Sequence, residues 1–101
     1  MKFTAAGDAL LQQRIPDNYA GFEQVRDFIE RGDARFFNLE TTLNYEGECF
    51  ASQFSGGTYV RTNPEGFGDM LRYGFNMTSF NNNHTMDFSY DGMLATLDHV
   101  D

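Results

Sequence analysis

Short apolar runs alternate three times with segments of helical periodicity along this chain. Residues 2–6, 34–40 and 75–80 form the short runs, and a longer segment with apolar residues at helical spacing follows each of them. Parallel strands need a crossover of a dozen or more residues, usually a helix, so this order indicates βαβ units. We therefore predict an α/β fold in which a βαβαβα unit forms a parallel sheet.

Start and stop residues place the three helices. The first is expected to begin at Asp17, which follows a proline and suits an N-cap, and to end at Gly32. The second is expected to begin at Asn63, which precedes a proline, and to end at Gly74, and the third begins near Ser89. Apolar residues on one helical face should be buried. These are Phe22, Val25 and Ile29 in the first helix, Phe67, Met70 and Leu71 in the second, and Met93, Leu94, Leu97 and Val100 in the third.

Polar side chains follow each predicted strand. Gly7 and Asp8 come after the first, Glu40 closes the second, and residues 81–84 (three asparagines and a histidine) follow the third. The carboxyl ends of parallel strands share one edge, where ligands bind, so these side chains should meet. Carboxylates, an amide oxygen and an imidazole suit Mn²⁺, Zn²⁺ or Fe. Each residue alone is more often a turn or cap residue, so three coincident strand ends favour a site without identifying it.

The segment between the second strand and the second helix has no clear period. It contains Gly47, Gly56 and Gly57, which predict a loop or a short hairpin over the site. Residues 58–61 are expected to form a short extended piece.

Composition describes one globular domain or a piece of one, with an acidic excess. Hydrophobic residues make up 41% of the 101 residues, and 15 acidic against 7 basic residues give a net charge of -8. This charge opposes phosphate neutralisation, so nucleic acid is not an expected partner, and converging carboxylates would require a cation. A chain of this size leaves much surface uncovered, so we expect a homo-oligomer or a further C-terminal segment to complete it.

The sequence contains no segment that would span a bilayer. No apolar run approaches the roughly 20 residues that a transmembrane helix needs. Residues 1–13 have too short an apolar stretch for a signal peptide, so a cell-envelope and a cytoplasmic location both stay open.

Four motifs resemble those of the bacterial CapA family of capsule and poly-γ-glutamate synthesis proteins, which is related to the calcineurin-like metallophosphoesterases. They are "GD" at 7–8, "NLETTL" at 38–43, "RTNPEGFGDMLRYGFN" at 61–76 and "NNHTMDFSYDGMLATLDHV" at 82–100. They cover nearly the whole chain. The match most specific for the family is the transition from the predicted third strand into "NNH". The resemblance implies that residues 1–101 are the N-terminal portion of a single CapA-like domain, part of a metallophosphoesterase-like α/β/β/α sandwich.

The resemblance also implies roles for the polar residues. Asp8 would bind a first metal ion, Glu40 would take the place of the bridging carboxylate, and Asn83 would bind a second metal ion through its side-chain oxygen. His84 would offer a proton to the leaving oxygen, and Asp87 would hold its imidazole in the useful tautomer. Two cations about 3.5–4 Å apart activate a bridging water and hold the attacking and leaving oxygens of a phosphoester.

The chain departs from the calcineurin-like pattern in three ways. The usual Asp-x-His pair is reduced to Asp8 followed by Ala9 and Leu10, and Glu40 replaces an aspartate. The remaining histidine ligands of the pattern would lie beyond position 101, since His99 reads as a solvated residue at a helix end. The chain would therefore carry about half of a site.

Three residues are candidate contacts to an anionic small-molecule or polymer substrate. Arg61, just before a helix, is the preferred one, and Arg14 and Asn82 are the others. An exposed loop cation that contacts no ligand is the ordinary alternative for each arginine.

Three functions remain open from the sequence. The leading one is a CapA-like protein of cell-envelope polymer metabolism that uses divalent metal to act on a phosphoester or a related anionic bond. The second is a non-catalytic polymer-handling or assembly subunit with the same fold, which the missing histidine after Asp8 favours. The third is a plain α/β domain whose polar strand ends are only caps.

Overall fold

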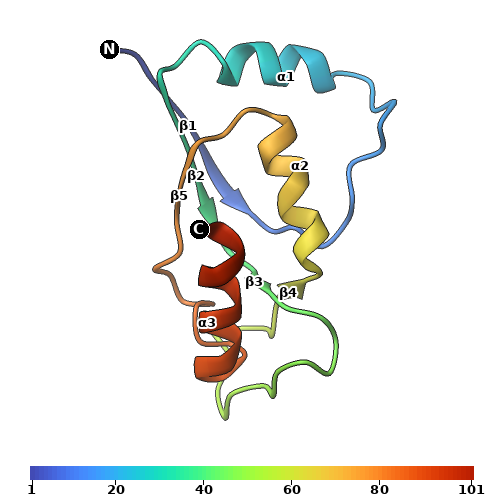
Figure 1. The fold of residues 1–101 in the computed structure, drawn as a ribbon, viewed down its shortest axis with the longest axis vertical. Helices are drawn as coiled ribbons and strands as arrows, with labels where there is room; N and C mark the ends of the chain where they lie inside the picture. The colour runs from blue at the N-terminus through green and yellow to red at the C-terminus, as the bar shows by residue number, and fades with distance from the viewer.

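A three-stranded parallel sheet forms the centre of the computed structural model, which describes residues 1–101 (Figure 1). Its strands β1 (Phe3–Ala9), β2 (Ala34–Leu39) and β5 (Met77–Ser79) are arranged in the order β1-β2-β5, and both neighbouring pairs are parallel. Helices separate these strands along the chain. The predicted parallel α/β architecture is therefore confirmed.

β1 is longer than predicted. Asp8 pairs with Asn38 and Ala9 with Leu39, after a shift of register between Ala5 and Asp8. The prediction that Gly7 and Asp8 end the strand is wrong, because this irregularity lets the pairing with β2 resume beyond Gly7. Asp8 consequently lies within β1, at its carboxyl end.

Helix α1 (Phe22–Ile29) begins four residues later than predicted. Gly21, with a φ of 94°, occupies the N-cap position in place of Asp17. The left-handed backbone of Gly21 interrupts the helical conformation, so the preceding loop does not continue into the helix. That loop is fixed to α2 (Phe67–Arg72), where Ile15 N donates a hydrogen bond to the Asp69 carboxylate. Figure 1 shows α1 across the end of the sheet where the strands begin.

The predicted second helix begins at Pro64 as a short 3-10 turn, η1 (Pro64–Gly66), and becomes α-helical only at Phe67, where α2 starts; it ends just before Gly74, as predicted. Asn63 occupies the N-cap position of η1, and Gly74, with a φ of 91°, follows the last residues of α2 in a conformation that suits glycine. Phe67 and Met70 are buried, but Leu71 is exposed. The buried face of α2 is therefore narrower than its sequence indicates.

A second, two-stranded sheet lies beyond the carboxyl end of the first. Strands β3 (Thr42–Leu43) and β4 (Arg61–Thr62) pair in parallel, so residues 44–60 form a loop. The predicted loop is confirmed, and the hairpin alternative is wrong, because a hairpin would pair the strands antiparallel. The short extended piece predicted at 58–61 overlaps β4 only at Arg61, because β4 starts three residues later and ends one residue later than predicted.

Helix α3 (Ser89–Val100) packs on β3 through small residues. Thr96 Oγ1 accepts a hydrogen bond from Leu43 N at 2.8 Å and donates one to Gly92 O at 2.7 Å. Gly92 and Thr96 are buried, whereas Leu94 and Leu97 are 51% and 40% exposed. The prediction of a buried leucine face is wrong because this hydrogen bond and the close approach at Gly92 turn the other side of α3 inward.

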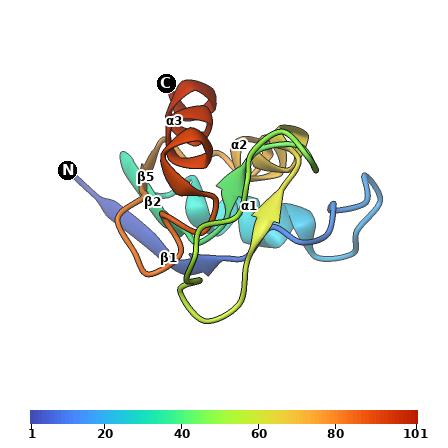
Figure 2. The same cartoon turned by 90° about the horizontal axis from the view of Figure 1, so that it is seen from below.

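The core lies between β2 and the helices. Phe37 is its centre, with its ring 6.1 Å from that of Phe67 and 5.0 Å from that of Phe75. In the view along the long axis, β1 lies on the outer side of the molecule, opposite α2 and α3 (Figure 2). Nine buried residues make up this core: Leu11, Ile29, Phe37, Leu39, Leu43, Phe67, Met70, Tyr73 and Phe75.

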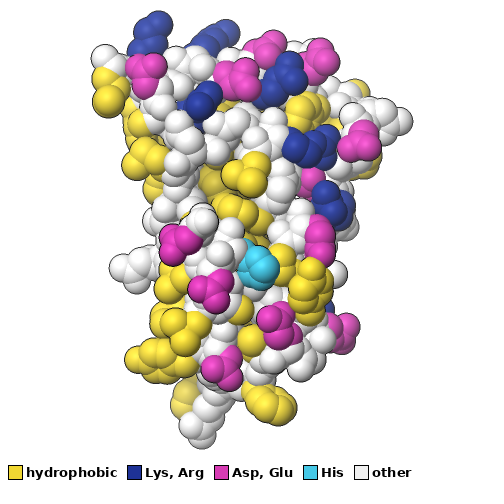
Figure 3. Space-filling view, viewed as in Figure 1, with side chains coloured by type: hydrophobic (Ala, Val, Ile, Leu, Met, Phe, Trp, Pro, Cys, Tyr) yellow, Lys and Arg dark blue, Asp and Glu magenta, His cyan; other side chains and the backbone are white.

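The surface carries charges of both signs and scattered apolar side chains. On the face in Figure 3, Lys and Arg lie mainly over the half that contains α1, whereas Asp and Glu occur over the whole length. No helix in this structure combines the length and the apolarity that crossing a membrane requires.

Candidate functional site

One amide group joins two of the predicted strand-end carboxylates. Asn38, near the carboxyl end of β2, donates through Nδ2 to Asp8 Oδ1 at 3.0 Å and to Glu40 Oε1 at 2.6 Å. Asn38 and Glu40 lie two residues apart, so they project from the same face of the strand. The structure thus brings together the carboxylates at the carboxyl ends of β1 and β2.

The same amide reaches the third strand. Asn38 Oδ1 accepts hydrogen bonds from Ser79 Oγ at 2.7 Å and from Asn82 Nδ2 at 3.3 Å. Asn82 Nδ2 also donates to Leu39 O at 2.7 Å. All three strands are therefore joined through side chains at the edge where they end.

His84 lies between this carboxylate pair and a buried aspartate. Its Nδ1 is 2.8 Å from Asp87 Oδ2, and its Nε2 is 3.9 Å from Glu40 Oε2. Asp87 is held in turn by Gly56 N, 2.7 Å from Oδ1, and by Val60 N, 3.0 Å from Oδ2. The buried carboxylate fixes the imidazole ring, so Nε2 faces Glu40.

The 44–60 loop packs directly against the turn at residues 81–84, which we call the asparagine turn. Asn83 Nδ2 donates to Gly56 O at 2.7 Å, while Asn83 Oδ1 accepts no hydrogen bond from the chain. Asn82 Oδ1 accepts from His84 N at 2.9 Å and so shapes the turn that presents the imidazole. The loop, the turn and the strand ends form one connected unit, which we call the strand-end cluster: Asp8, Asn38, Glu40, Asn82, His84 and Asp87.

Arg14 is committed to a structural ion pair. Its Nε is 2.9 Å from Oδ2 of the buried Asp69, and Arg72 contacts the other oxygen of the same carboxylate at 2.9 Å. Burial acts to raise the pKa of Asp69, but hydrogen bonds from Arg14, Ile15 N and Arg72 outweigh it and hold that pKa below its ordinary value. Arg14 therefore has less freedom to bind a ligand than the sequence suggests.

The Asp69 carboxylate gives a testable pH dependence. A lowered native pKa stabilises the fold above the ordinary value of 3.8, and this contribution is lost as the pH falls through the native pKa. We expect Asp69→Asn to lower the free energy of unfolding at pH 7 by about 2 kcal/mol and to flatten its dependence on pH below about 4. Urea unfolding between pH 2 and 7 measures both effects. Asp17→Asn is the matched control, because Asp17 contacts the same Arg72 at 3.6 Å but is fully exposed; an equal loss in both variants would contradict the assignment.

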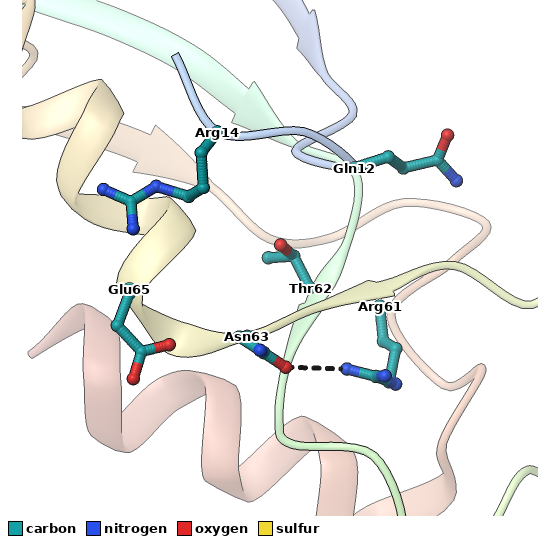
Figure 4. A pocket seen from close by; sticks show the side chains of 6 residues that line it. All are labelled: Gln12, Arg14, Arg61, Thr62, Asn63 and Glu65. Carbon is teal, nitrogen blue, oxygen red and sulfur yellow. Dashed lines mark hydrogen bonds between the residues drawn. The ribbon is translucent and has the colours of Figure 1, made fainter. Parts of the chain in front are cut away.

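Arg61 lines a polar cavity of about 440 Å³ together with Arg14. In Figure 4, Thr62 projects into the space between the segment after β1 and β4, while Arg14 points toward α2 and Arg61 lies beside Asn63. Arg61 NH1 donates to Asn44 O at 3.1 Å and to Asn63 Oδ1 at 3.0 Å. The cavity wall consists of Gln12, Arg14, Arg61, Thr62, Asn63 and Glu65.

The single carboxylate in this cavity is kept ionised. Tyr45 Oη donates a hydrogen bond to Glu65, which lowers the pKa of the Glu65 carboxyl and raises that of the Tyr45 hydroxyl. Arg14 is paired with buried Asp69, and Arg61 lies 3.7 Å from the exposed Glu46, so the cavity has no excess of positive charge. Arg61 is the cation of this cavity that an anionic group could reach by displacing Glu46.

Comparisons with known proteins identify the family of this chain. A sequence model of the family described as "Bacterial capsule synthesis protein PGA_cap" matches residues 2–101. The chain belongs to this family. It is also 29% identical over 97 residues to two proteins of Sinorhizobium fredii, described as "Uncharacterized protein y4sH" and "Uncharacterized protein y4uA". The match covers 91% of this chain and 21% of each relative, so the chain spans about a fifth of their length.

Sequence reasoning missed the residues that connect the cluster. Asn38 has a usable signal, because it is a polar residue inside an aromatic strand, two positions before Glu40 and therefore on the same face. Gly56 is predicted from the sequence only as a loop residue. Its close approach to Asn83 has no signature in a single sequence.

The cluster offers a divalent cation the right kinds of donor but few of them. Asp8 and Glu40 offer carboxylate oxygens with no thiolate beside them, a donor type that suits Mn²⁺, Zn²⁺ or Fe. However, no three histidine, cysteine or acidic side chains of this chain converge on a single point. The donors therefore fit a cation in chemical type but not in number.

Proposed function

We propose that this member of the capsule synthesis family is a metal-dependent hydrolase that acts on a phosphoester or a related anionic bond. The observation that carries the proposal is the shared amide of Asn38, which brings Asp8 and Glu40 together, with His84 Nε2 facing Glu40. Carboxylates gathered at the carboxyl edge of a parallel sheet need a compensating positive charge, and a divalent cation supplies it.

Asp8 and Glu40 are the residues that would hold a first cation. Asn83, whose Oδ1 accepts no hydrogen bond from the chain, would contribute an amide oxygen to a second. Bound there, one or two Mn²⁺, Zn²⁺ or Fe ions would activate a water and neutralise phosphoryl oxygens. We assign the chain's own residues the tasks of orienting the substrate and moving a proton.

His84 is suited to exchange a proton at the substrate. Its Nδ1 is held by Asp87, which stabilises a proton on that nitrogen and leaves Nε2 to act toward the strand-end carboxylates. Both side chains are largely shielded, since the His84 and Asp87 side chains are 13% and 0% exposed. In the imidazolium form both ring nitrogens carry a proton, and Nε2 is then the atom that would deliver its proton to a leaving oxygen, which returns the ring to the tautomer protonated at Nδ1.

Arg61 is the preferred contact to the anionic substrate, and Arg14 is secondary. Arg14 is tied to buried Asp69, whereas the only carboxylate near Arg61 is Glu46 at 3.7 Å, which is almost fully exposed and easily displaced. Arg61 directly follows Val60, whose N–H is bound to Asp87. The cavity and the His84–Asp87 pair are thus connected through adjacent residues, and Asn82 contributes by shaping the His84 turn.

Hydrolysis of a chromogenic phosphodiester by the Mn²⁺-loaded full chain tests this function. We expect turnover that is abolished by a chelator and that falls at least 100-fold in His84→Asn, because removing a general acid typically costs 10²–10⁴ in rate. His99→Asn is the matched control, since His99 lies at the end of α3. Equal rates in the two variants would refute the role of His84 as a general acid. The absence of chelator-sensitive turnover by the wild type with Mn²⁺, Zn²⁺ and Fe²⁺ alike would refute the hydrolase.

A non-catalytic polymer-handling or assembly subunit is the second candidate, and one observation favours it. Leu10 stands where the Asp-x-His pattern of the phosphoesterases that this chain resembles would place a histidine, and no three-donor group forms within the chain. Under this alternative the Arg61 cavity binds an anionic polymer without cleavage. Retention of a polyanionic polymer by chelator-treated protein, with no turnover in any metal, would support it over the hydrolase.

A further inference from the structure

We propose that the cavity beside Arg61 binds a polyhydroxylated unit that carries one anionic group, such as a sugar acid or a sugar phosphate. The inference rests on the proposed role of Arg61 as the contact to an anionic substrate, and it adds the chemical class of the group that this residue would hold. The cavity volume of about 440 Å³ lies within the range of about 300–1,000 Å³ that is typical of small-molecule sites. Six residues line it, and none of them is hydrophobic: Gln12, Arg14, Arg61, Thr62, Asn63 and Glu65.

This entirely polar wall selects a ligand that is polar over its whole surface. Small-molecule sites are ordinarily lined by hydrophobic and aromatic side chains, which cover the apolar part of the ligand. Here the wall consists of guanidinium, amide, hydroxyl and carboxylate groups, which would lose their hydration against an alkyl or aryl group and gain no hydrogen bond in return. Hydroxyl groups both donate and accept, so they can replace water at every group of the wall. A polyol therefore fits this cavity, and an apolar group does not.

The anionic group of the ligand belongs at Arg61. Its NH1 donates to Asn44 O at 3.1 Å and to Asn63 Oδ1 at 3.0 Å, and these two bonds orient the guanidinium. The nearest carboxylate is that of Glu46, 3.7 Å away and 92% exposed, so a ligand carboxylate or phosphate can displace it at little cost. Arg61 thus presents an oriented donor fork to one anionic group.

Glu65 determines what the opposite end of the ligand must offer. Tyr45 Oη donates a hydrogen bond to Glu65 Oε1, which holds the pKa of this carboxyl below its ordinary value. An ionised carboxylate only accepts hydrogen bonds, so its other oxygen requires a donor from the ligand and repels a second anionic group. The positive charge of Arg14 acts on the same carboxylate and would oppose an ammonium group placed beside it. Neutral hydroxyl groups are therefore the donors that suit Glu65.

Neutral polar groups lie between the two charged ones. In Figure 4, Thr62 and Asn63 separate Glu65 from Arg61, and Gln12 extends from the segment that follows β1. The Gln12 amide and the Thr62 hydroxyl take part in no hydrogen bond with the rest of the chain, so both are available to a ligand. The wall thus offers a cation, then neutral donors and acceptors, then a carboxylate. A ring with an acid group on one side and hydroxyl groups on the other matches that order.

NMR titrations of the isotopically labelled full chain, in EDTA and at constant ionic strength, test the inference with sodium glucuronate as the probe. We expect saturable shifts of the backbone signals of residues 61–65, with a Kd on the order of 1 mM. Glucose, acetate and inorganic phosphate should each bind about tenfold more weakly, because each of them makes only part of the contacts. A parallel titration with glucose 6-phosphate shows whether the site prefers a phosphate or a carboxylate as the acid group.

Variants assign the two ends of the ligand to their residues. Arg61→Gln should weaken glucuronate binding about tenfold, to the level of glucose, and Arg61→Lys should recover part of the loss, because lysine keeps the charge without the planar fork. Glu65→Gln should weaken glucose and glucuronate alike, because their hydroxyl groups lose a charged acceptor. Arg26→Gln is the matched control, since Arg26 belongs to α1 and does not line the cavity. It should bind glucuronate as the wild type does.

Three results would overturn the inference. Acetate, phosphate or glutamate bound as tightly as glucuronate would mean that the hydroxyl groups contribute nothing. The other two are the absence of saturable shifts with both glucuronate and glucose 6-phosphate, and an equal loss of binding in Arg61→Gln and Arg26→Gln. The hydrolase is tested separately, because these titrations contain no metal ion. Glucuronate binding without chelator-sensitive turnover would remove the hydrolase and leave the binding site, whereas turnover without such binding would remove this inference alone.

Discussion

Replacing Gly56 with alanine is expected to lower the free energy of unfolding by about 3 kcal/mol and to detach the 44–60 loop from the candidate site. A Cβ atom at this position would lie 1.8 Å from Asn83 O and 2.4 Å from Asn83 C, which are backbone atoms that cannot rotate away. The loop must therefore move, and Asp87 then loses the hydrogen bond from Gly56 N. Urea unfolding measures the stability, and the NMR signals of the His84 ring report the loss of its support.

Gly68→Ala is the matched control for this substitution. A Cβ at Gly68 meets nothing within 4 Å, and alanine within helix α2 should stabilise the protein by about 0.5–1 kcal/mol. A Gly56→Ala variant as stable as wild type, with unchanged His84 signals, would mean that the close packing of the loop on the asparagine turn does not exist in solution.

Replacing Glu40 with glutamine is expected to abolish cation binding while leaving the fold almost unchanged. The Gln side chain has nearly the same shape and still offers an oxygen to Asn38 Nδ2, so we expect a change in the free energy of unfolding below about 1 kcal/mol. The negative charge that attracts the cation is lost, so Mn²⁺ affinity should fall at least 100-fold, as titration calorimetry would measure. With the cation lost, chelator-sensitive hydrolysis should vanish as well.

Glu48→Gln is the control for charge alone. Glu48 is a carboxylate that accepts a hydrogen bond from Tyr45 N, away from the strand-end cluster, and its substitution removes the same unit of charge. If Glu40→Gln and Glu48→Gln bind Mn²⁺ equally well, Glu40 is a strand-end cap, and the interpretation of these polar residues as turn and cap residues is correct.

The sequence was sufficient to predict the parallel sheet and the meeting of Asp8 with Glu40. Strand and helix periods define the order of elements, and parallel topology then forces the carboxyl ends of the strands to one edge. The position of His84 next to Glu40 follows from the same rule. The pairing of His84 with Asp87 was expected from the family resemblance, and the structure contains it.

The errors arise where tertiary contacts override local patterns. Leu94 and Leu97 lie at helical spacing and read as a core face, yet the hydrogen bond from Leu43 N to Thr96 decides which side of α3 turns inward. Asp17 reads as a cap, but Gly21 adopts a left-handed conformation and takes the N-cap position, so the helix starts only at Phe22. Such choices depend on partners distant in the chain, which periodicity does not register.

The Asn38 amide is an intermediate case. Its position on the Glu40 face of β2 follows from the strand period, but the four hydrogen bonds that it makes depend on how β1 and β5 align with β2. The alignment with β1 includes the irregularity before Asp8, which no local signal specifies. A single sequence thus indicates which residues meet at the strand ends and leaves open how they are bonded.

Paramagnetic broadening by Mn²⁺ is the most direct test of a cation site at the strand ends. In NMR spectra of the isotopically labelled full chain, substoichiometric Mn²⁺ should broaden the Asn38 side-chain amide and the signals of Asp8, Glu40 and His84 first. Signals of the acidic residues on α1 and α3, such as Asp27 and Asp98, should persist at the same Mn²⁺ concentration. Broadening that begins on those helices, or that spreads evenly over all acidic residues, would contradict the account.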